Sequence, residues 1–285
     1  MVQTSSTHSD RNSWFRLPGR MIRLYLDLVG RAIIGFAETA RGLGAFALIT
    51  LGTTLSKFGF AKAVIRPLIF SQIYESGLKL LPMIAFLGVA LGFVIIGQTV
   101  ALLTSVGAQG FTGPVMVAVV VRELGPLTTA LIVLARVGTT TVIELGMSRA
   151  TGEIEALEAL GIDPIHLLVV PRVIGKAVSI FALTIYLILI ALISGYAFVM
   201  VQNVPLTPAA YVEQLAMALT WQDFVLVALK TLSFGAIIAV VTCYQGLAQP
   251  LRLEQVAPAT SRAVVAGTIG CVLIDAIFIT LFLFL

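Results

Sequence analysis

The stretch VRELGPLTTALIVLARVGTTTVIELG, residues 121–146, decides the fold class of this chain. It belongs to an apolar run over about residues 114–146 in which few side chains are ionisable. Crossing about 30 Å of hydrocarbon takes roughly 20 residues of α-helix. A run this long and this uniformly apolar lacks the alternation of barrel strands. The stretch therefore predicts a long transmembrane helix, which Gly125-Pro126 is expected to kink because proline removes a backbone hydrogen bond.

The remainder of the chain has the same character. Hydrophobic residues make up 59% of its 285 residues and charged residues only 11%, whereas soluble domains carry about 25% charged residues. Further apolar runs of spanning length occupy about residues 80–104, 177–201, 224–243 and 263–285. We therefore predict an all-α integral membrane protein with five transmembrane helices.

The distribution of basic residues predicts the orientation. The connecting segments 105–113 and 202–223 contain no Lys or Arg. The connections on the other side hold Arg149, Arg172, Lys176, Arg252 and Arg262. Because cytoplasmic loops are enriched in Lys and Arg, we predict a cytoplasmic N-terminus and an outer C-terminus. This asymmetry accounts for the net charge of +4 without nucleic-acid binding. On the outer side, residues 205–223 predict a short helix with Trp221 at the membrane interface.

The N-terminal region differs from the spans. Residues 1–15 form a polar tail, and residues 16–66 predict an interfacial or re-entrant helical segment. Its apolar part, 42–56, would give only about 22 Å of helix at about 1.5 Å per residue, and both its flanks are basic. Around Asp27 the polar side chains share one helix face, as in helices that lie in the headgroup plane. A cytosolic helix packed on a partner is the alternative.

Ionisable residues inside the predicted spans are candidates for function, because they are costly in a membrane and usually face protein or water. They are Arg122, Glu123, Arg136, Glu144, Lys230 and Asp275. Arg122 or Lys230 could neutralise Glu123 or Asp275. The charges could also line a substrate path, and the sequence leaves both interpretations open.

The segment TGEIEALEALGIDPI, residues 151–165, gathers acidic residues between two apolar runs. It predicts a short helix over 151–161, with Thr151 as the expected N-cap and Gly161 at a left-handed end. The orientation predicts a cytoplasmic position. There it is either a docking site for a cytosolic partner or a solvated connector.

The sequence carries no recognisable catalytic or metal-binding motif. The chain contains no G-x-x-x-x-G-K-[ST] phosphate-binding loop. Its two cysteines, Cys243 and Cys271, each stand alone in an apolar run, which favours buried free thiols. We therefore expect no catalytic residue, cofactor or metal site in this chain.

From about Gln72 to Leu285 the sequence resembles the MlaE/YrbE permeases, the membrane subunits of ABC transporters that move phospholipid or related lipids between membranes. The resemblance is densest over residues 121–173, which begin VRELGPLTTALIVLARVG and continue through EIEALEALGIDP to PRV. The segments QGLAQPLRLEQVAPATSRAVV, residues 245–265, and LIDAIF, residues 273–278, add to it. The segment 246–257 is poorer in glycine than is usual for the family. Residues 67–285 are thus identified as a permease domain of this type.

The resemblance implies partners. It implies a homodimer in the inner membrane, two cytosolic ATPase subunits that bind ATP and magnesium, a STAS-domain subunit, and a periplasmic protein with an MCE domain. The system would maintain the lipid asymmetry of the outer membrane. The acidic helix would be the coupling helix that contacts the ATPase, through Glu153, Ile154, Glu155, Leu157 and Glu158.

The resemblance also implies roles for residues in the spans. Arg122, Glu123 and Lys230 would line the lipid path. Gln98, Leu91, Val94 and Ile95 of the first span would supply its apolar wall. Arg136, Glu144 and Asp275 would be structural charges. Two other functions stay open: an ion-coupled secondary transporter or channel that uses Glu123, Lys230 and Asp275, and a passive membrane scaffold.

Overall fold

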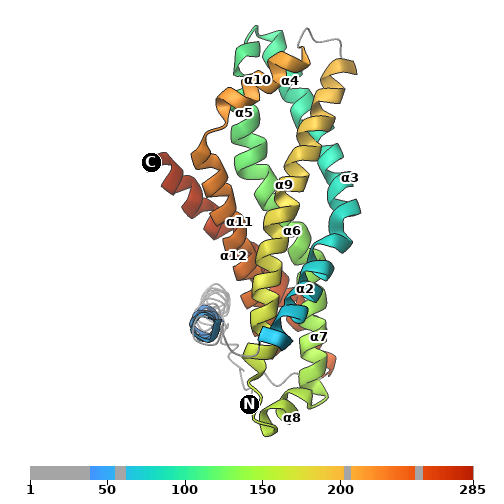
Figure 1. Ribbon diagram of the computed structural model, residues 1–285, viewed down its shortest axis with the longest axis vertical. Helices are drawn as coiled ribbons and strands as arrows, with labels where there is room; N and C mark the ends of the chain where they lie inside the picture. Colours follow the sequence, from blue (N-terminus) through green and yellow to red (C-terminus); the bar gives the residue numbers. More distant parts are fainter. Residues whose placement is uncertain (1–38, 55–61, 202–206, 248–252, 285) are drawn as a thin grey trace, which may run out of the picture. The chain divides into compact units, whose positions relative to one another are not determined.

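The computed structural model describes residues 39–54, 62–201, 207–247 and 253–284, and these are almost entirely helical, with no strand among them (Figure 1). The chain divides into two units, Met1–Ala47 and Leu48–Leu285. The predicted polar tail and the polar face around Asp27 lie outside the described residues. Residues 39–54 are helical, and their position relative to a membrane stays a prediction.

Within the described part of the chain, five helical segments are long and apolar enough to span a membrane, as predicted. They are Val64–Ser105, Thr112–Ala150, Ile165–Val201, Trp221–Leu247 and Val256–Phe282. The first contains α2 (Lys62–Ser76), η1 (Leu78–Leu80), α3 (Leu81–Leu91), η2 (Gly92–Ile96) and α4 (Gly97–Ser105). The second contains α5 (Thr112–Met116), η4 (Val117–Leu124), α6 (Gly125–Val133), η5 (Leu134–Gly138) and α7 (Thr139–Ala150). The last three are η6 (Ile165–Val169) with α9 (Val170–Val201), α11 (Trp221–Leu247) and α12 (Val256–Phe284).

The helices extend beyond the predicted runs. The first span begins at Val64 rather than 80, and the third at Ile165 rather than 177. Charged residues such as Lys79 and Lys176 ended the apolar runs in the sequence. The helices continue through them, because a backbone in hydrocarbon must satisfy its polar groups within the helix. The second span also passes through Gly125-Pro126 without ending, since Pro126 stands in the first turn of α6, directly after the π-helical η4.

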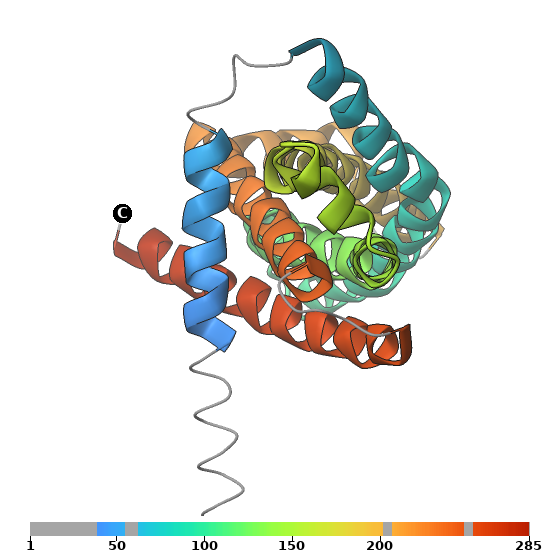
Figure 2. The same cartoon turned by 90° about the horizontal axis from the view of Figure 1, so that it is seen from below.

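Helix α9 lies at the centre of the spans and packs against α2, α3, α6 and α11. Figure 2 looks along the spans and shows the other helices arranged around it. Close approach depends on small residues, as in membrane helix pairs generally. At Gly235 of α11, a Cβ atom would lie 2.3 Å from the Ala177 Cα of α9. Buried apolar side chains from five helices, Ile84, Val133, Leu187, Phe234 and Cys271 among them, fill the space between the spans.

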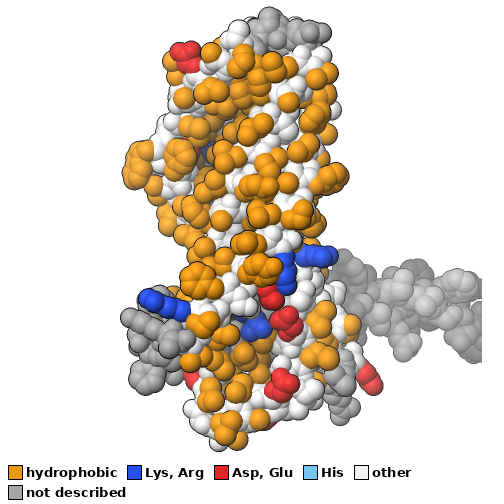
Figure 3. All heavy atoms as spheres, turned by 45° about the vertical axis from the view of Figure 1, so that its right-hand side comes forward, with side chains coloured by type: hydrophobic (Ala, Val, Ile, Leu, Met, Phe, Trp, Pro, Cys, Tyr) orange, Lys and Arg blue, Asp and Glu red, His pale blue; other side chains and the backbone are white. Residues whose placement is uncertain are grey.

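Apolar side chains also cover the outside of the spans. In Figure 3 they spread over most of the visible face, while most charged side chains gather in its lower part. Phe86, Ile193 and Phe224 are examples of large exposed side chains. A soluble monomer rarely exposes a continuous apolar surface of this size, so the distribution is that of a surface in contact with lipid.

Short helices close the two ends of the bundle. At one end α10 (Pro208–Ala218) packs on α5, and at the other α8 (Glu153–Ala159) packs on α7 (Figure 1). Thr207 caps α10 by accepting a hydrogen bond from the Ala210 amide at 3.3 Å. The Tyr211 hydroxyl donates to the Leu192 carbonyl at 3.3 Å, and burial raises the pKa of Tyr211 to about 12. The short helix predicted within residues 205–223 is therefore present, and its position on the outer side stays a prediction.

Candidate functional site

Lys230 of α11 is the centre of a charged cluster inside the spans. Its Nζ lies 2.8 Å from Oε2 of Glu123 on η4 and 2.6 Å from Oδ1 of Asp275 on α12. It also donates a hydrogen bond to the Arg122 carbonyl at 2.9 Å. Only 4% of the Lys230 surface is exposed. An ammonium has three donors and no acceptor. The Arg122 carbonyl and Glu123 accept two of its hydrogen bonds, and Asp275 is an ion-pair partner.

The local sequence explains why a carbonyl joins this cluster. In an α-helix the Arg122 carbonyl would accept from the amide four residues on. That residue is Pro126, which has no N–H. The carbonyl, at the end of the π-helical η4, therefore has no α-helical donor, and the Lys230 ammonium supplies one. The R-E-L-G-P element thus presents two ligands to one lysine, a backbone oxygen and the Glu123 carboxylate.

The Arg122 side chain turns to a different carboxylate. Its Nε lies 2.7 Å from Oδ1 of Asp223, and its guanidinium lies 4.3 Å from the centre of the Phe282 ring. Asp223 is buried, with 1% of its surface exposed. Its Oδ2 accepts from the Thr220 amide at 2.8 Å and from the Thr220 hydroxyl at 2.9 Å. Asp223 therefore both caps α11 and fixes the arginine.

Asp223 is a site residue that the sequence interpretation missed, since it was assigned to the outer connection 202–223. It belongs to α11, which begins at Trp221. A usable signal was present: Thr220 and Asp223 have the spacing of a capping box, [ST]-x-x-[DE], ahead of an apolar run. The prediction that Arg122 or Lys230 neutralises Glu123 or Asp275 is thus correct for Lys230, whereas Arg122 uses Asp223.

The cluster opens into a small cavity with a volume of about 90 Å³. The charged side chains in its wall are Arg122, Glu123 and Lys230, and the apolar ones are Leu226, Val227, Phe278, Ile279 and Phe282. Glu123 is the most open member of the ion-paired group, with 37% of its side chain exposed. The cavity therefore combines a charged wall with an aromatic and aliphatic one.

The predicted apolar wall from the first span lies elsewhere in a single chain. Val94 and Gln98 are exposed, while Leu91 and Ile95 are partly buried and pack into the cores of the bundle. None of the four lines the cavity at Lys230. Their role in a lipid path stays a prediction.

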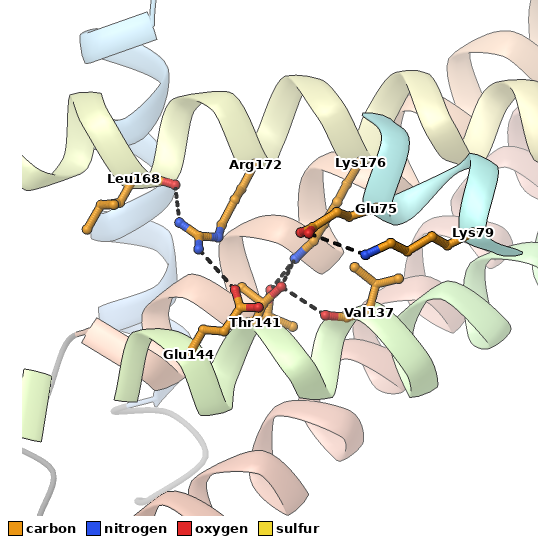
Figure 4. A network of polar contacts seen from close by, with 9 residues as sticks. Glu75, Lys79, Val137, Thr141, Glu144, Leu168, Arg172 and Lys176 are labelled. Atoms are coloured by element: carbon orange, nitrogen blue, oxygen red, sulfur yellow. Dashed lines mark hydrogen bonds and ion pairs between the residues drawn. The ribbon is translucent and has the colours of Figure 1, made fainter. Parts of the chain in front are cut away.

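A second polar network lies in the opposite half of the spans (Figure 4). Lys176 of α9 is completely buried and donates to the Thr141 hydroxyl at 2.9 Å and to the Thr242 hydroxyl at 3.1 Å. Nearby, Arg172 pairs with Glu144 at 3.2 Å. The sequence had placed Lys176 in an inner connection. It lies within a span because α9 begins before the predicted run.

Arg136 and Glu144, grouped in the sequence, form no ion pair with each other among the described residues. Glu144 uses Arg172 of the third span instead. Arg136 and Glu144 both line a cavity of about 250 Å³, to which Glu75 and Lys79 of the first span also belong. Glu75 and Lys79 pair at 3.5 Å on the exposed side.

The acidic helix is anchored by one residue. Ile154 of α8 is 1% exposed, whereas Glu153, Glu155 and Glu158 are exposed and Leu157 is partly buried. Glu155 pairs with Nε of Arg149 at 3.2 Å. Three carboxylates of α8 thus face away from the bundle core.

Of the two predicted ends of α8, only the C-terminal one is correct. The expected N-cap is wrong: the Thr151 hydroxyl donates back to the Met147 carbonyl at 3.1 Å, and Gly152, with φ of 81°, starts the helix. Gly161, with φ of 76°, ends it in the left-handed region, as predicted. The Asp163 carboxylate then accepts from the Ile165 amide at 3.0 Å and turns the chain into the third span. Cys243 and Cys271 are buried free thiols, as predicted.

Comparison with known proteins places these features in a family. Residues 69–281 match the family described as permease MlaE. A probable ABC transporter permease protein of Rickettsia prowazekii is 30% identical over 87% of this chain and 94% of its own length. The intermembrane phospholipid transport system permease protein MlaE of Haemophilus influenzae is 25% identical over 90% and 97%. The chloroplastic protein TRIGALACTOSYLDIACYLGLYCEROL 1 of Arabidopsis thaliana is 28% identical over 74% and 60%. The chain belongs to the MlaE permease family and is the membrane subunit of a transporter.

Proposed function

We propose that this chain is the permease subunit of an ABC transporter that moves phospholipid between the inner membrane and a periplasmic partner. The observation that carries the proposal is the cavity at Lys230, where charged and aromatic side chains meet inside the spans. A phospholipid needs both a polar contact for its phosphate and an apolar surface for its chains. The printed name of the Haemophilus influenzae relative adds support, since it specifies phospholipid transport.

Within this function Arg122 is the phosphate contact, and Lys230 is a positioning residue. Lys230 is surrounded by three oxygens of this chain, so its charge is compensated within the protein. Arg122 is partly exposed, and its Nε pairs with Asp223. The planar guanidinium has five N–H donors and matches a phosphate bidentately. Glu123, the exposed carboxylate, repels the phosphate and thereby limits how long a headgroup stays.

A second copy of the chain completes the site. The cavity holds about 90 Å³, whereas small-molecule sites usually measure about 300–1,000 Å³. Two copies that face each other would add to this cavity the exposed faces of their first spans, including Val94 and Gln98. We therefore propose a homodimer with the lipid between the copies.

The energy comes from a separate ATPase. The proposed docking site is α8, with its three exposed carboxylates and its buried anchor Ile154. ATP and magnesium would bind to two such cytosolic subunits, accompanied by a STAS-domain subunit. An MCE-domain protein would bind at the α10 end, on the periplasmic side. This assignment places the N-terminus in the cytoplasm and the C-terminus in the periplasm.

The second candidate function is ion-coupled transport. It is favoured by one observation, that Lys230 lies between two carboxylates, Glu123 and Asp275, inside the spans. Such an arrangement can exchange a proton or a cation. It requires an ion gradient rather than ATP, and this difference separates the two functions.

The test uses the complete complex in liposomes that contain a fluorescent phospholipid. We expect lipid movement to require ATP and to persist when an ionophore collapses the ion gradients. Arg122→Ala should reduce the ATP-dependent rate about 10-fold or more, the range for a lost hydrogen bond to a charged group. Arg122→Lys should restore part of it. Movement that stops with the ionophore and ignores ATP would contradict the proposal.

A further inference from the structure

A larger cavity than that at Lys230 lies far from it along the chain, at the beginning of the first and third spans. Its volume is about 490 Å³, which is within the range of small-molecule sites. Helix α2 contributes Ile65, Arg66, Ile69 and Phe70, η6 contributes His166, and α9 contributes Val170 and Ile174. Five of these seven side chains are hydrocarbon, so the interior of the cavity is suited to an acyl chain.

Two side chains give the cavity a polar edge. His166 has two buried ring nitrogens, and neither has a hydrogen-bond partner among the described residues. Arg66 is exposed and forms no ion pair with a described carboxylate. Buried polar atoms are usually hydrogen-bonded, so the imidazole indicates a missing partner. A guanidinium beside it favours an anionic partner.

The position of the cavity limits what that partner can be. Arg66 and His166 each lie within two residues of the start of a span, Val64 and Ile165. These starts are on the basic side of the protein, which is the cytoplasmic leaflet in the orientation proposed above. At the cytoplasmic surface of the membrane, the molecule that carries both a phosphate and apolar chains is a phospholipid.

We propose that this cavity is a second lipid site, which holds one phospholipid of the cytoplasmic leaflet. One acyl chain fills the space between α2 and α9. The phosphate contacts Arg66. An oxygen of the phosphate or of the ester accepts a hydrogen bond from His166. This site rests on the proposed orientation and is separate from the lipid path at Lys230.

The site is connected to the coupling helix through a short segment. His166 is in η6, which directly follows the Asp163-Pro164 turn after α8. The Asp163 carboxylate holds the Ile165 amide at 3.0 Å. A lipid bound at His166 therefore stabilises the segment that joins α8 to the third span, and its loss would loosen that segment.

The test uses the full chain in nanodiscs of phosphatidylglycerol with a trace of phosphatidylglycerol that carries a photoreactive tail. After illumination, peptide mass spectrometry locates the adducts. We expect adducts in residues 65–70 and 166–174. Ile174→Trp should remove most of them by filling the cavity. The double variant Arg66→Ala with His166→Ala should reduce them about 10-fold, the effect of about 1.4 kcal/mol. Arg136→Ala is the matched control and should change nothing at these peptides.

A second probe, a photoreactive diacylglycerol, has the same tail but no phosphate. It distinguishes a site that binds the headgroup from an apolar surface that binds only the acyl chains. Equal labelling by both probes, unchanged in the double variant, would overturn the proposal. No labelling of these peptides, as when protein rather than lipid fills the cavity, would also overturn it. Adducts near Phe278 and Phe282 report the lipid path independently. They should persist in both cavity variants, and their loss in the unchanged protein would count against the proposed function instead.

Discussion

Two lysines are buried among the spans, and they differ in what surrounds them. Lys230 is held by two carboxylates and a carbonyl and borders a cavity. Lys176 is completely buried, donates to two threonine hydroxyls, and forms no ion pair among the described residues. Each joins three helices: η4, α11 and α12 around Lys230, and α7, α9 and α11 around Lys176. The same residue type therefore connects three helices in two different ways, through ion pairs at Lys230 and through hydrogen bonds to hydroxyl groups at Lys176.

Lys230 neutralises two neighbouring carboxylates, whereas Lys176 neutralises none among the described residues. Glu123 and Asp275 would face each other uncompensated without Lys230. The partners of Lys176 are already satisfied, because Thr141 donates to the Val137 carbonyl at 2.8 Å and Thr242 to the Ile238 carbonyl at 2.7 Å. Removing the two lysines should therefore have unequal consequences.

The largest effect is expected for Lys230→Met. Removal of one partner from a buried ion pair leaves the other charge unpaired, which costs about 3–5 kcal/mol. Here Asp275, which is largely buried, loses its cation, and Glu123 is repelled by it. The measurement is the free energy of unfolding of the purified protein in detergent.

A triple variant tests the cause of that effect. Lys230→Met combined with Glu123→Gln and Asp275→Asn removes both uncompensated charges, so most of the lost stability should return. A triple variant as unstable as the single one would show that packing around the lysine stem, rather than charge, dominates. The comparison between the two lysines would then fail.

The sequence predicted the spans and the members of this cluster, but it offered the ion pairs only as alternatives. Apolar runs of spanning length leave little choice of fold, and ionisable residues within them stand out individually. Which carboxylate meets which cation depends on the relative rotation and depth of separate helices. Lys230 and Asp275 are 45 positions apart in the sequence, and no local pattern fixes that distance.

The errors at the edges have one cause. Asp223 and Lys176 were assigned to connections, and the start of α2 to the interfacial segment 16–66, because charges ended the apolar runs there. The burial of Asp223 and Lys176 comes from neighbouring helices, which the sequence of one segment does not contain. Only the Thr220–Asp223 capping pair carried a local signal. The left-handed Gly161 was predictable, whereas Gly152 was not, because Thr151 beside it was an equally good candidate for the cap.

A smaller effect is expected from Gly235→Ala, which lies on α11 between Lys230 and Thr242. The added Cβ would lie 2.3 Å from the Ala177 Cα and 2.7 Å from the Ala177 nitrogen, so the backbones of α9 and α11 must separate. Overpacking of this kind costs about 1–3 kcal/mol. Chemical denaturation should detect it, with Gly44→Ala, where nothing lies within 4 Å, as the control. Equal stability of the two variants would mean that the helices yield more easily than the contact suggests.

The smallest effect is expected for Lys176→Met. Methionine has a similar length, and because Lys176 forms no ion pair with a described residue, its removal leaves no opposite charge uncompensated. The two threonines keep their own-helix carbonyls, so no buried donor is left without an acceptor. We expect the free energy of unfolding to change by less than about 1.5 kcal/mol, the usual limit for a volume-conserving change, and lipid movement to be unaffected.

A loss of stability as large as that in Lys230→Met would show that the Lys176 charge is itself needed by its neighbours. The nearest candidate for that need is the Arg172–Glu144 pair, which lies one helical turn away on α9 and α7, and Lys176→Met with Glu144→Gln would then identify it.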